Sequence, residues 1–72
     1  MGYQANGNKV IYLHRNGETH DVADCLEAEK AAKMLERGQY LQERYRKYTA
    51  CARLYFQAEQ LPGFHWLTPA GE

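Results

Sequence analysis

Residues 6–17, which read NGNKVIYLHRNG, decide the fold of this chain. An Asn-Gly pair stands at each end of the stretch. Asn-Gly is the strongest short signal for a β-hairpin, because a type I′ turn needs positive φ at both central positions. Residues 10–12 between the pairs are β-branched or aromatic, as strands prefer. The stretch therefore predicts a central strand with a turn at each end, within an antiparallel meander of two or three strands.

The two turns also predict the strand register. A two-residue turn at Asn16-Gly17 predicts three facing pairs, which are Arg15–Glu18, His14–Thr19 and Ile11–Val22. The same turn type at Asn6-Gly7 predicts the pairs Ala5–Asn8 and Tyr3–Val10. Opposite charges at Arg15 and Glu18 favour the second register by a few tenths of a kcal/mol.

Two α-helices are predicted after the meander. Asp24 and Glu27 have the spacing of a capping box, and the residues from Asp24 to Arg37 are strong helix formers. The apolar face of this first helix consists of Val22, Leu26 or Cys25, Ala28, Ala32 and Leu35. A second helix is predicted from Gln39 to Leu61, where Pro62-Gly63 ends it. Gly38 either ends the first helix as a C′ residue or lies inside one long helix.

The remaining residues complete a single α+β domain that spans residues 1–72. Residues 64–67 are predicted to form a short strand or an apolar latch, and residues 68–72 are predicted to fray. The two cysteines, Cys25 and Cys51, are too few for the disulfide framework of a small secreted protein. No stretch approaches the roughly 18 apolar residues of a membrane span. We therefore expect a cytoplasmic protein with reduced thiols and no membrane partner.

Charge is unevenly distributed along a chain whose formal net charge is zero. This balance argues against an acidic mimic of DNA and against a generic polycationic binder of nucleic acid. Residues 21–36 carry five acids against two lysines, whereas residues 39–61 carry four bases against two acids. The pattern predicts two helices that pack with complementary charge, within one chain or across a homodimer.

The second helix contains a basic, tyrosine-rich stretch at residues 44–48, which reads RYRKY. Such a mixture can clamp phosphates with cations and stack bases on tyrosine rings. Tyr45, Tyr48 and Tyr55 fall on one helical line, however, and the cations fall on others. We therefore expect the tyrosines in the core or an interface, with the cations at its solvated rim.

Zinc binding and catalysis find little support in the sequence. Thiolate and imidazole suit zinc, and the chain offers His14, His20, Cys25, Cys51 and His65. There is no Cys-x-x-Cys pair, and the predicted register places His14 and His20 on opposite faces of the sheet. Phosphate-binding loops and nucleophile elbows are missing from the sequence, which leaves only a Cys–His dyad as a catalytic arrangement. The sequence therefore predicts no metal, no cofactor and no enzymatic activity.

These observations favour a non-enzymatic protein-binding module, which acts as a small inhibitor, adaptor or regulator of a larger protein or nucleoprotein complex. Small accessory proteins of phages and other mobile elements, such as inhibitors of host defence, have this size. The predicted contact residues are Arg44, Arg46, Lys47, Arg53, Tyr45, Tyr48 and Trp66. Trp66 serves as an exposed anchor or closes the core. The alternative function is a small nucleic-acid-binding regulator that uses the second helix, and a structural or assembly subunit ranks third.

Overall fold

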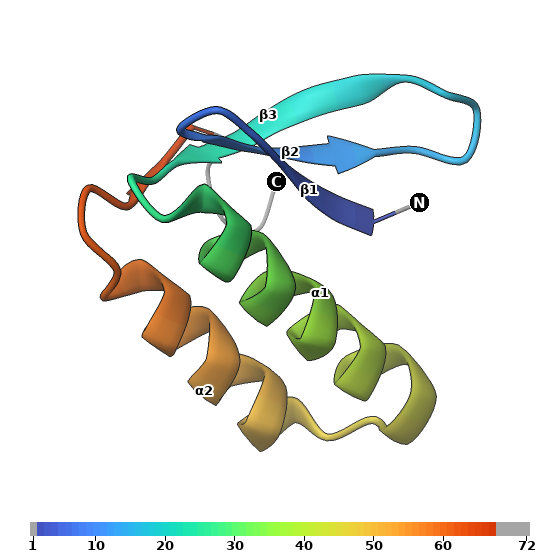
Figure 1. Cartoon of the computed structure of the whole chain (residues 1–72). Helices are drawn as coiled ribbons and strands as arrows, with labels where there is room; N and C mark the ends of the chain where they lie inside the picture. The colour runs from blue at the N-terminus through green and yellow to red at the C-terminus, as the bar shows by residue number, and fades with distance from the viewer. Residues whose placement is uncertain (1, 68–72) are drawn as a thin grey trace.

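The chain folds into two layers, with a four-stranded antiparallel sheet lying over a pair of helices (Figure 1). The computed structural model describes residues 2–67, so the fraying predicted for residues 68–72 lies outside the described part. The elements in chain order are β1 (Gly2–Asn6), β2 (Lys9–Leu13), β3 (Thr19–Asp24), α1 (Ala28–Tyr45), α2 (Tyr48–Glu59) and β4 (His65–Trp66). This arrangement confirms the predicted α+β class.

The strands lie in the order β1-β2-β3-β4, with each neighbour antiparallel. The short strand predicted within residues 64–67 is β4, which pairs Trp66 with Ala23 and His65 with Asp24. Its pairing brings the chain back to the sheet after both helices. The described part of β1 pairs only with β2, so β1 forms one edge of the sheet.

The predicted register of the first hairpin is wrong by two residues. Asn6 faces Lys9 and Ala5 faces Val10, so the two-residue loop consists of Gly7 and Asn8. Gly7 has a φ of 63°, whereas Asn8 does not have positive φ. Glycine at the first loop position with positive φ is typical of a type II′ turn. The prediction failed because it assumed a type I′ turn centred on Asn6-Gly7.

The predicted register of the second hairpin is wrong by one residue near the turn. Leu13 faces Thr19, and the loop has three residues, Arg15, Asn16 and Gly17. Gly17 adopts a φ of 91°, and the Asn16 side chain accepts a hydrogen bond from the Glu18 N–H at 3.0 Å. A type I turn followed by a left-handed residue is the usual three-residue hairpin loop.

A β-bulge in β3 then restores the pairing that the two-residue turn predicted. Ile11 faces Asp21, but the next pair along the strands is Val10 with Ala23, so Val22 is the extra residue. Val22 and Ala23 are both buried although they are adjacent in sequence. The bulge therefore lets two successive residues of β3 contribute to the core.

The first helix begins later and ends later than predicted. Asp24 belongs to β3, and Glu27 occupies the N-cap position without a capping hydrogen bond from its side chain. The chain between them is held by hydrogen bonds from the Cys25 N–H to Asn8 and from the Leu26 N–H to Pro62. Of the two alternatives for Gly38, the structure shows it inside a helix, α1, and the break between the helices falls eight residues later, at Arg46.

The core between the two layers is built mainly from small side chains. Its fully or nearly fully buried hydrophobic residues are Val10, Val22, Ala23, Cys25, Ala28, Ala31, Ala32, Leu35, Cys51 and Ala58. Cys25 occupies the core position for which the sequence left Leu26 as the alternative, and Leu26 is 65% exposed. None of the helices within residues 2–67 has the length and apolar character needed to cross a membrane.

Candidate interaction surface on the helix layer

Six of the seven predicted contact residues gather where α1 turns into α2. Arg44 and Tyr45 end α1, Arg46 and Lys47 form the connection, and Tyr48 begins α2. Arg53 follows in the second turn of α2. All six are exposed, and we call them the helix elbow.

The backbone of the elbow explains why a basic segment is held so compactly here. Arg46 adopts a left-handed conformation with a φ of 54°, and its N–H donates to the Gln42 carbonyl at 3.1 Å. The Lys47 N–H donates to the Leu41 carbonyl at 3.3 Å. These bonds occupy carbonyls that the end of α1 would otherwise leave without partners. The chain therefore reverses within two residues, and both of them are cations.

A shallow hollow of about 490 Å³ lies at the start of α2, lined by Arg46, Lys47, Tyr48, Thr49, Ala50 and Arg53. The first backbone hydrogen bond of α2 runs from the Cys51 N–H to the Lys47 carbonyl. The N–H groups that precede it add the positive end of a helix dipole to three cationic side chains. The hollow therefore combines cationic side chains with the positive end of a helix, an arrangement that favours carboxylate or phosphate groups.

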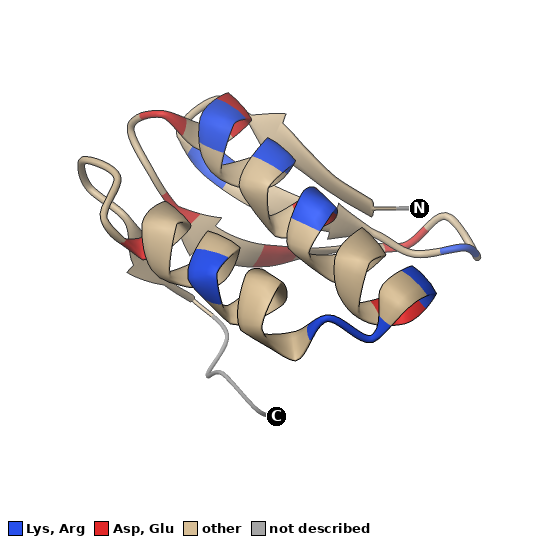
Figure 2. Ribbon diagram, turned by 90° about the horizontal axis from the view of Figure 1, so that it is seen from below, with Lys and Arg blue, Asp and Glu red and all other residues tan. Residues whose placement is uncertain are grey.

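The positive surface continues along α1, although residues 21–36 carry five acids against two lysines. Lys30, Lys33, Arg37 and Arg44 fall within about 60° of one another around the helix axis, opposite the buried face. Figure 2 views the molecule from this side, and Lys and Arg segments recur along α1 and through the connection to α2. Only Lys9 and Arg15 of the nine Lys and Arg residues lie outside the helix layer.

Summing charges over a segment hid this stripe, whereas sorting them by helical face reveals it. Glu29, Glu36 and Glu43 fall within about 40° of one another, on the flank of α1 nearest β1. Lys30, Arg37 and Arg44 recur at the same interval of seven residues, one position later in the sequence. The net charge of residues 21–36 is negative, although Lys30 and Lys33 lie on the face of α1 opposite its buried residues.

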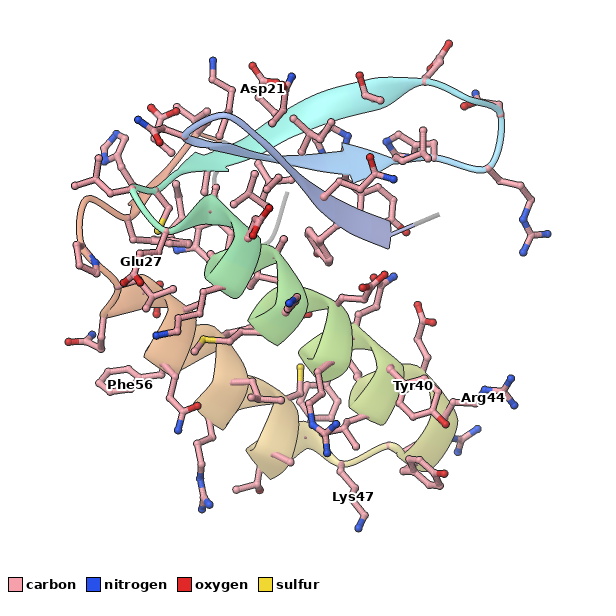
Figure 3. All side chains as sticks on the ribbon, viewed as in Figure 1. Asp21, Glu27, Tyr40, Arg44, Lys47 and Phe56 are labelled. Carbon is pink, nitrogen blue, oxygen red and sulfur yellow. The ribbon has the colours of Figure 1, made fainter. Side chains whose placement is uncertain are left out.

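Aromatic side chains accompany the cations on this outer surface. Tyr48 is 72% exposed and Phe56 is 61% exposed, and Tyr40 and Tyr45 are also exposed. Tyr40 and Tyr45 pack edge to face with ring centroids 5.8 Å apart. Figure 3 shows Tyr40, Lys47 and Phe56 pointing away from the sheet. Of the two predicted locations, core or interface, the core therefore does not contain Tyr45 and Tyr48, whereas Tyr55 is half-buried against it.

Trp66, the seventh predicted contact residue, lies at the other end of α2. It is half-buried against the core, packs edge to face on Phe64 with centroids 4.9 Å apart, and donates from Nε1 to the Glu59 carboxylate at 2.7 Å. These contacts join β4 to α2. The structure therefore places Trp66 away from the helix elbow, in the role of closing the core.

The two histidines of the second hairpin lie side by side, which corrects the prediction that they face opposite ways. His14 Nε2 lies 2.7 Å from His20 Nδ1, and both rings contact Tyr12. The three-residue loop causes the difference, because it shifts the register by one residue and so moves His14 to the face that carries His20. Within residues 2–67, no group of three or more His, Cys, Asp or Glu side chains is arranged to hold a metal ion.

The two cysteines are buried and reduced, and each thiol has a nearby acceptor. Cys25 Sγ lies 3.6 Å from the Pro62 carbonyl, and Cys51 Sγ lies 3.4 Å from Gln42 Oε1. Burial raises the pKa of Tyr55, and a hydrogen bond with Cys51 raises it further. The pKa of Tyr3 is also raised, first by burial and then by the nearby Tyr12. The Tyr3 and Tyr55 hydroxyls thus form a polar contact between β1 and α2.

No family model, curated protein or solved structure matches this chain. Its function is inferred from the residues and surfaces described above.

Proposed function

We propose that this protein is a non-enzymatic binding module that docks the outer face of its helix layer on an anionic surface of a larger protein or nucleoprotein complex. It would act as a small inhibitor, adaptor or regulatory subunit in the cytoplasm. An inhibitor encoded by a phage or another mobile element is one form that such a module takes. The contacts would come from the helix elbow and from Lys30, Lys33 and Arg37.

One observation carries this proposal, which is the segregation of cations and exposed aromatic rings on one face. Tyrosine and arginine are enriched at the centres of protein interfaces, because each combines a large contact area with directional hydrogen bonds. Matching charge on the partner would accelerate encounter and fix the orientation of docking. Glu29, Glu36 and Glu43 lie on the flank of α1, away from this face, whereas the Glu27 carboxylate lies 3.9 Å from Lys30 Nζ and pairs with one cation of the stripe.

Nucleic-acid binding is the second candidate, and the length of the cationic stripe favours it. Lys30 and Arg44 are separated by a helical rise of about 21 Å, and Arg46 and Lys47 extend the line beyond the end of α1. A row of cations of this length can follow a phosphate backbone. The exposed Tyr45 and Tyr48 could then stack on unpaired bases.

The decisive experiment is an affinity pull-down of the tagged protein from its native cell, with and without nuclease, followed by mass spectrometry. We expect a stoichiometric protein partner that survives nuclease. The double variant Arg37→Gln/Arg44→Gln should recover about fivefold less of it, because both cations lie at the proposed interface. The matched control is Lys9→Gln/Arg15→Gln, which removes the same charge from the sheet and should recover the partner normally.

Circular dichroism should first show that both double variants are folded. A partner that disappears with nuclease would contradict the protein-docking proposal. It would support the nucleic-acid alternative if binding of the purified protein also weakens steeply as salt is raised. Equal loss of partner in both double variants would show that net charge, rather than the helix face, governs binding.

A further inference from the structure

A continuous groove runs between the edge strand β1 and the flank of α1, on a different side of the molecule from the helix elbow. Three hollows of about 690, 360 and 340 Å³ follow one another along this seam. The first two share Ala5, Glu29 and Lys33, and the last two share Glu36. The groove therefore extends along the whole of β1, from Gly7 at the hairpin loop to Gly2.

Within residues 2–67, the outward backbone groups of the strand beside this groove pair with no other strand. In an antiparallel pair, facing residues alternate between hydrogen-bonded and non-hydrogen-bonded positions. Asn6 and Lys9 flank the two-residue loop, so they form a hydrogen-bonded pair. Counted back along β1 from Asn6, Ala5 and Tyr3 therefore occupy the non-hydrogen-bonded positions. Their backbone N–H and C=O groups therefore point away from β2, toward the open edge. An edge of this kind is a template for another extended chain.

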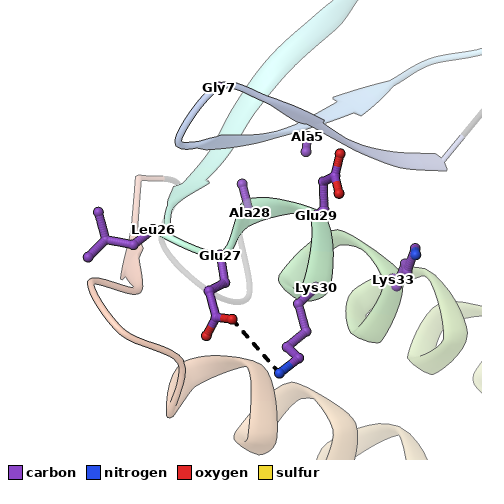
Figure 4. A pocket seen from close by; sticks show the side chains of 8 residues that line it. All are labelled: Ala5, Gly7, Leu26, Glu27, Ala28, Glu29, Lys30 and Lys33. Atoms are coloured by element: carbon purple, nitrogen blue, oxygen red, sulfur yellow. Dashed lines mark ion pairs between the residues drawn. The ribbon is translucent and has the colours of Figure 1, made fainter.

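The side chains along the seam leave room for that chain. Gly2, Ala5, Ala28 and Ala32 supply small residues at the base of the groove. Figure 4 shows the hollow nearest the hairpin loop, where Glu29 points toward β1 beside Ala5 while Glu27 and Lys30 point toward α2. A strand of five residues is about 17 Å long, and Glu29 and Glu43 are separated by a helical rise of about 21 Å. The edge and the row of carboxylates thus have similar lengths.

We propose that an extended segment of a partner protein, with lysine or arginine at alternate positions, adds to the free edge of β1 and lies in this groove. Its backbone would bond to Tyr3 and Ala5, and the side chains on its inner face would meet Glu29, Glu36 and Glu43. Glu29 and Glu36 form no ion pair within residues 2–67, so their charges are available to such a segment. Lys30, Lys33 and Arg15 also line the groove, so these three cations and the four glutamates of the lining (Glu27, Glu29, Glu36 and Glu43) leave it a net charge of −1, with three of the glutamates in a row on α1.

Charge also distinguishes this occupant from a second copy of the chain. Pairing two β1 edges in antiparallel fashion would place the same flank of α1 from both copies along one seam. The glutamates of one copy would then face those of the other, and like charges disfavour that arrangement. The lysines or arginines of a basic segment from a different protein would instead attract these glutamates.

The test uses a short capped peptide of alternating lysine and valine as the probe, with fluorescence anisotropy at low salt as the readout. We expect saturable binding that is lost when glutamate replaces lysine, or when the peptide backbone is N-methylated. Ala5→Pro should weaken binding about tenfold or more, because proline removes the outward N–H while a proline at an edge leaves the pairing with β2 intact. Glu29→Gln/Glu36→Gln should weaken it about fivefold.

Glu18→Gln, which removes a carboxylate from the exposed second hairpin, is the control and should bind the probe normally. NMR should show slower exchange of the Tyr3 and Ala5 amides in the complex. Absence of saturable binding would overturn the proposal, as would affinity that is unchanged in a folded Ala5→Pro variant. Self-association that Ala5→Pro abolishes would assign the edge to a second copy instead. None of these results bears on the helix face, because the residues changed lie outside it.

Discussion

Gly38 has no side chain because the Tyr55 ring occupies the space beside it. A Cβ built on Gly38 would lie 2.6 Å from Cε1 of Tyr55, which is too close for unstrained packing. Gly38 lies in the interior of α1, where glycine is about 1 kcal/mol less favourable than alanine. The close approach of α1 and α2 therefore requires glycine against the local preference of the helix.

We predict that Gly38→Ala lowers the free energy of unfolding by about 1–3 kcal/mol, because overpacking outweighs the gain in helix propensity. Urea denaturation followed by circular dichroism measures the difference. In a Tyr55→Leu background, which removes the ring, Gly38→Ala should lower the free energy of unfolding by less than it does in the wild type. Greater stability in Gly38→Ala than in the wild type would show that the ring moves aside without cost.

Tyr55 and Tyr3 predict how stability depends on alkaline pH. Burial raises the pKa of both phenols in the folded state, so the unfolded chain releases these protons at a lower pH than the folded chain does. The contribution of the two tyrosines to the free energy of unfolding is fully present below about pH 10, the ordinary pKa of tyrosine. It is lost as the pH rises through their raised pKa values in the folded protein. We therefore expect the free energy of unfolding to fall between pH 9 and 11, to a smaller extent in Tyr55→Phe.

The matched control for this measurement is Tyr48→Phe, because Tyr48 is exposed and should leave the pH dependence unchanged. Urea titrations of the three proteins at several pH values isolate the contribution of Tyr55 from the effects of pH that all three proteins share. A slope that is the same in wild type and Tyr55→Phe would contradict the assignment to Tyr55.

The connection between the helices depends on the left-handed backbone of Arg46. A non-glycine residue in this conformation is strained by about 1–2 kcal/mol, and glycine is the preferred residue at such a cap. We predict that Arg46→Gly raises the free energy of unfolding by about 0.5–1 kcal/mol, after the greater flexibility of glycine in the unfolded chain is counted. Thermal denaturation measures the change.

The same variant separates stability from binding at the elbow. Under the proposed function, Arg46→Gly removes a contact cation, so a more stable protein should bind its partner less well. Arg46→Ala is the comparison, because it removes the same charge but keeps the strain. A stability equal to that of Arg46→Ala would show that the left-handed cap is not under strain.

The whole molecule has a thin core, and this limits how much damage the fold can tolerate. Leu35 and Val10 are the largest fully buried aliphatic side chains of the described residues, and half of the buried hydrophobic residues are alanines. Domains of this size have total stabilities near the low end of the usual range of about 5–15 kcal/mol. A single large core residue therefore carries a substantial share of the total.

We predict that Leu35→Ala costs about 2–5 kcal/mol and leaves much of the protein unfolded at 37 °C. The exposed Leu26→Ala should change stability little, and it serves as the control. Far-ultraviolet circular dichroism at increasing temperature distinguishes the two. A partner that binds only the folded state should partly rescue Leu35→Ala, because binding adds to apparent stability by mass action.

Local signals in the sequence determined the class of the fold and the composition of the elbow. The apolar strand between two glycine-containing turns, the helix formers that follow and the stop at Pro62-Gly63 each act through short-range backbone preferences. Residues 44–48 stood out by composition alone, and six of the seven predicted contact residues do lie together. The partner of these residues stays a proposal, because composition identifies a surface but not what it binds.

Only the tertiary structure decided the strand registers, the position of the helix break and the sorting of charge by face. Asn-Gly is compatible with several turn types, and the packing of Val22 and Ala23 into one core selected a three-residue loop and a bulge. Gly38 had the local signature of a helix end, but it lies inside α1, where its lack of a side chain makes room for the Tyr55 ring, distant in sequence. The physical reason is common to all three. Backbone preferences differ by about 1 kcal/mol, and long-range packing decides among alternatives that lie so close in free energy.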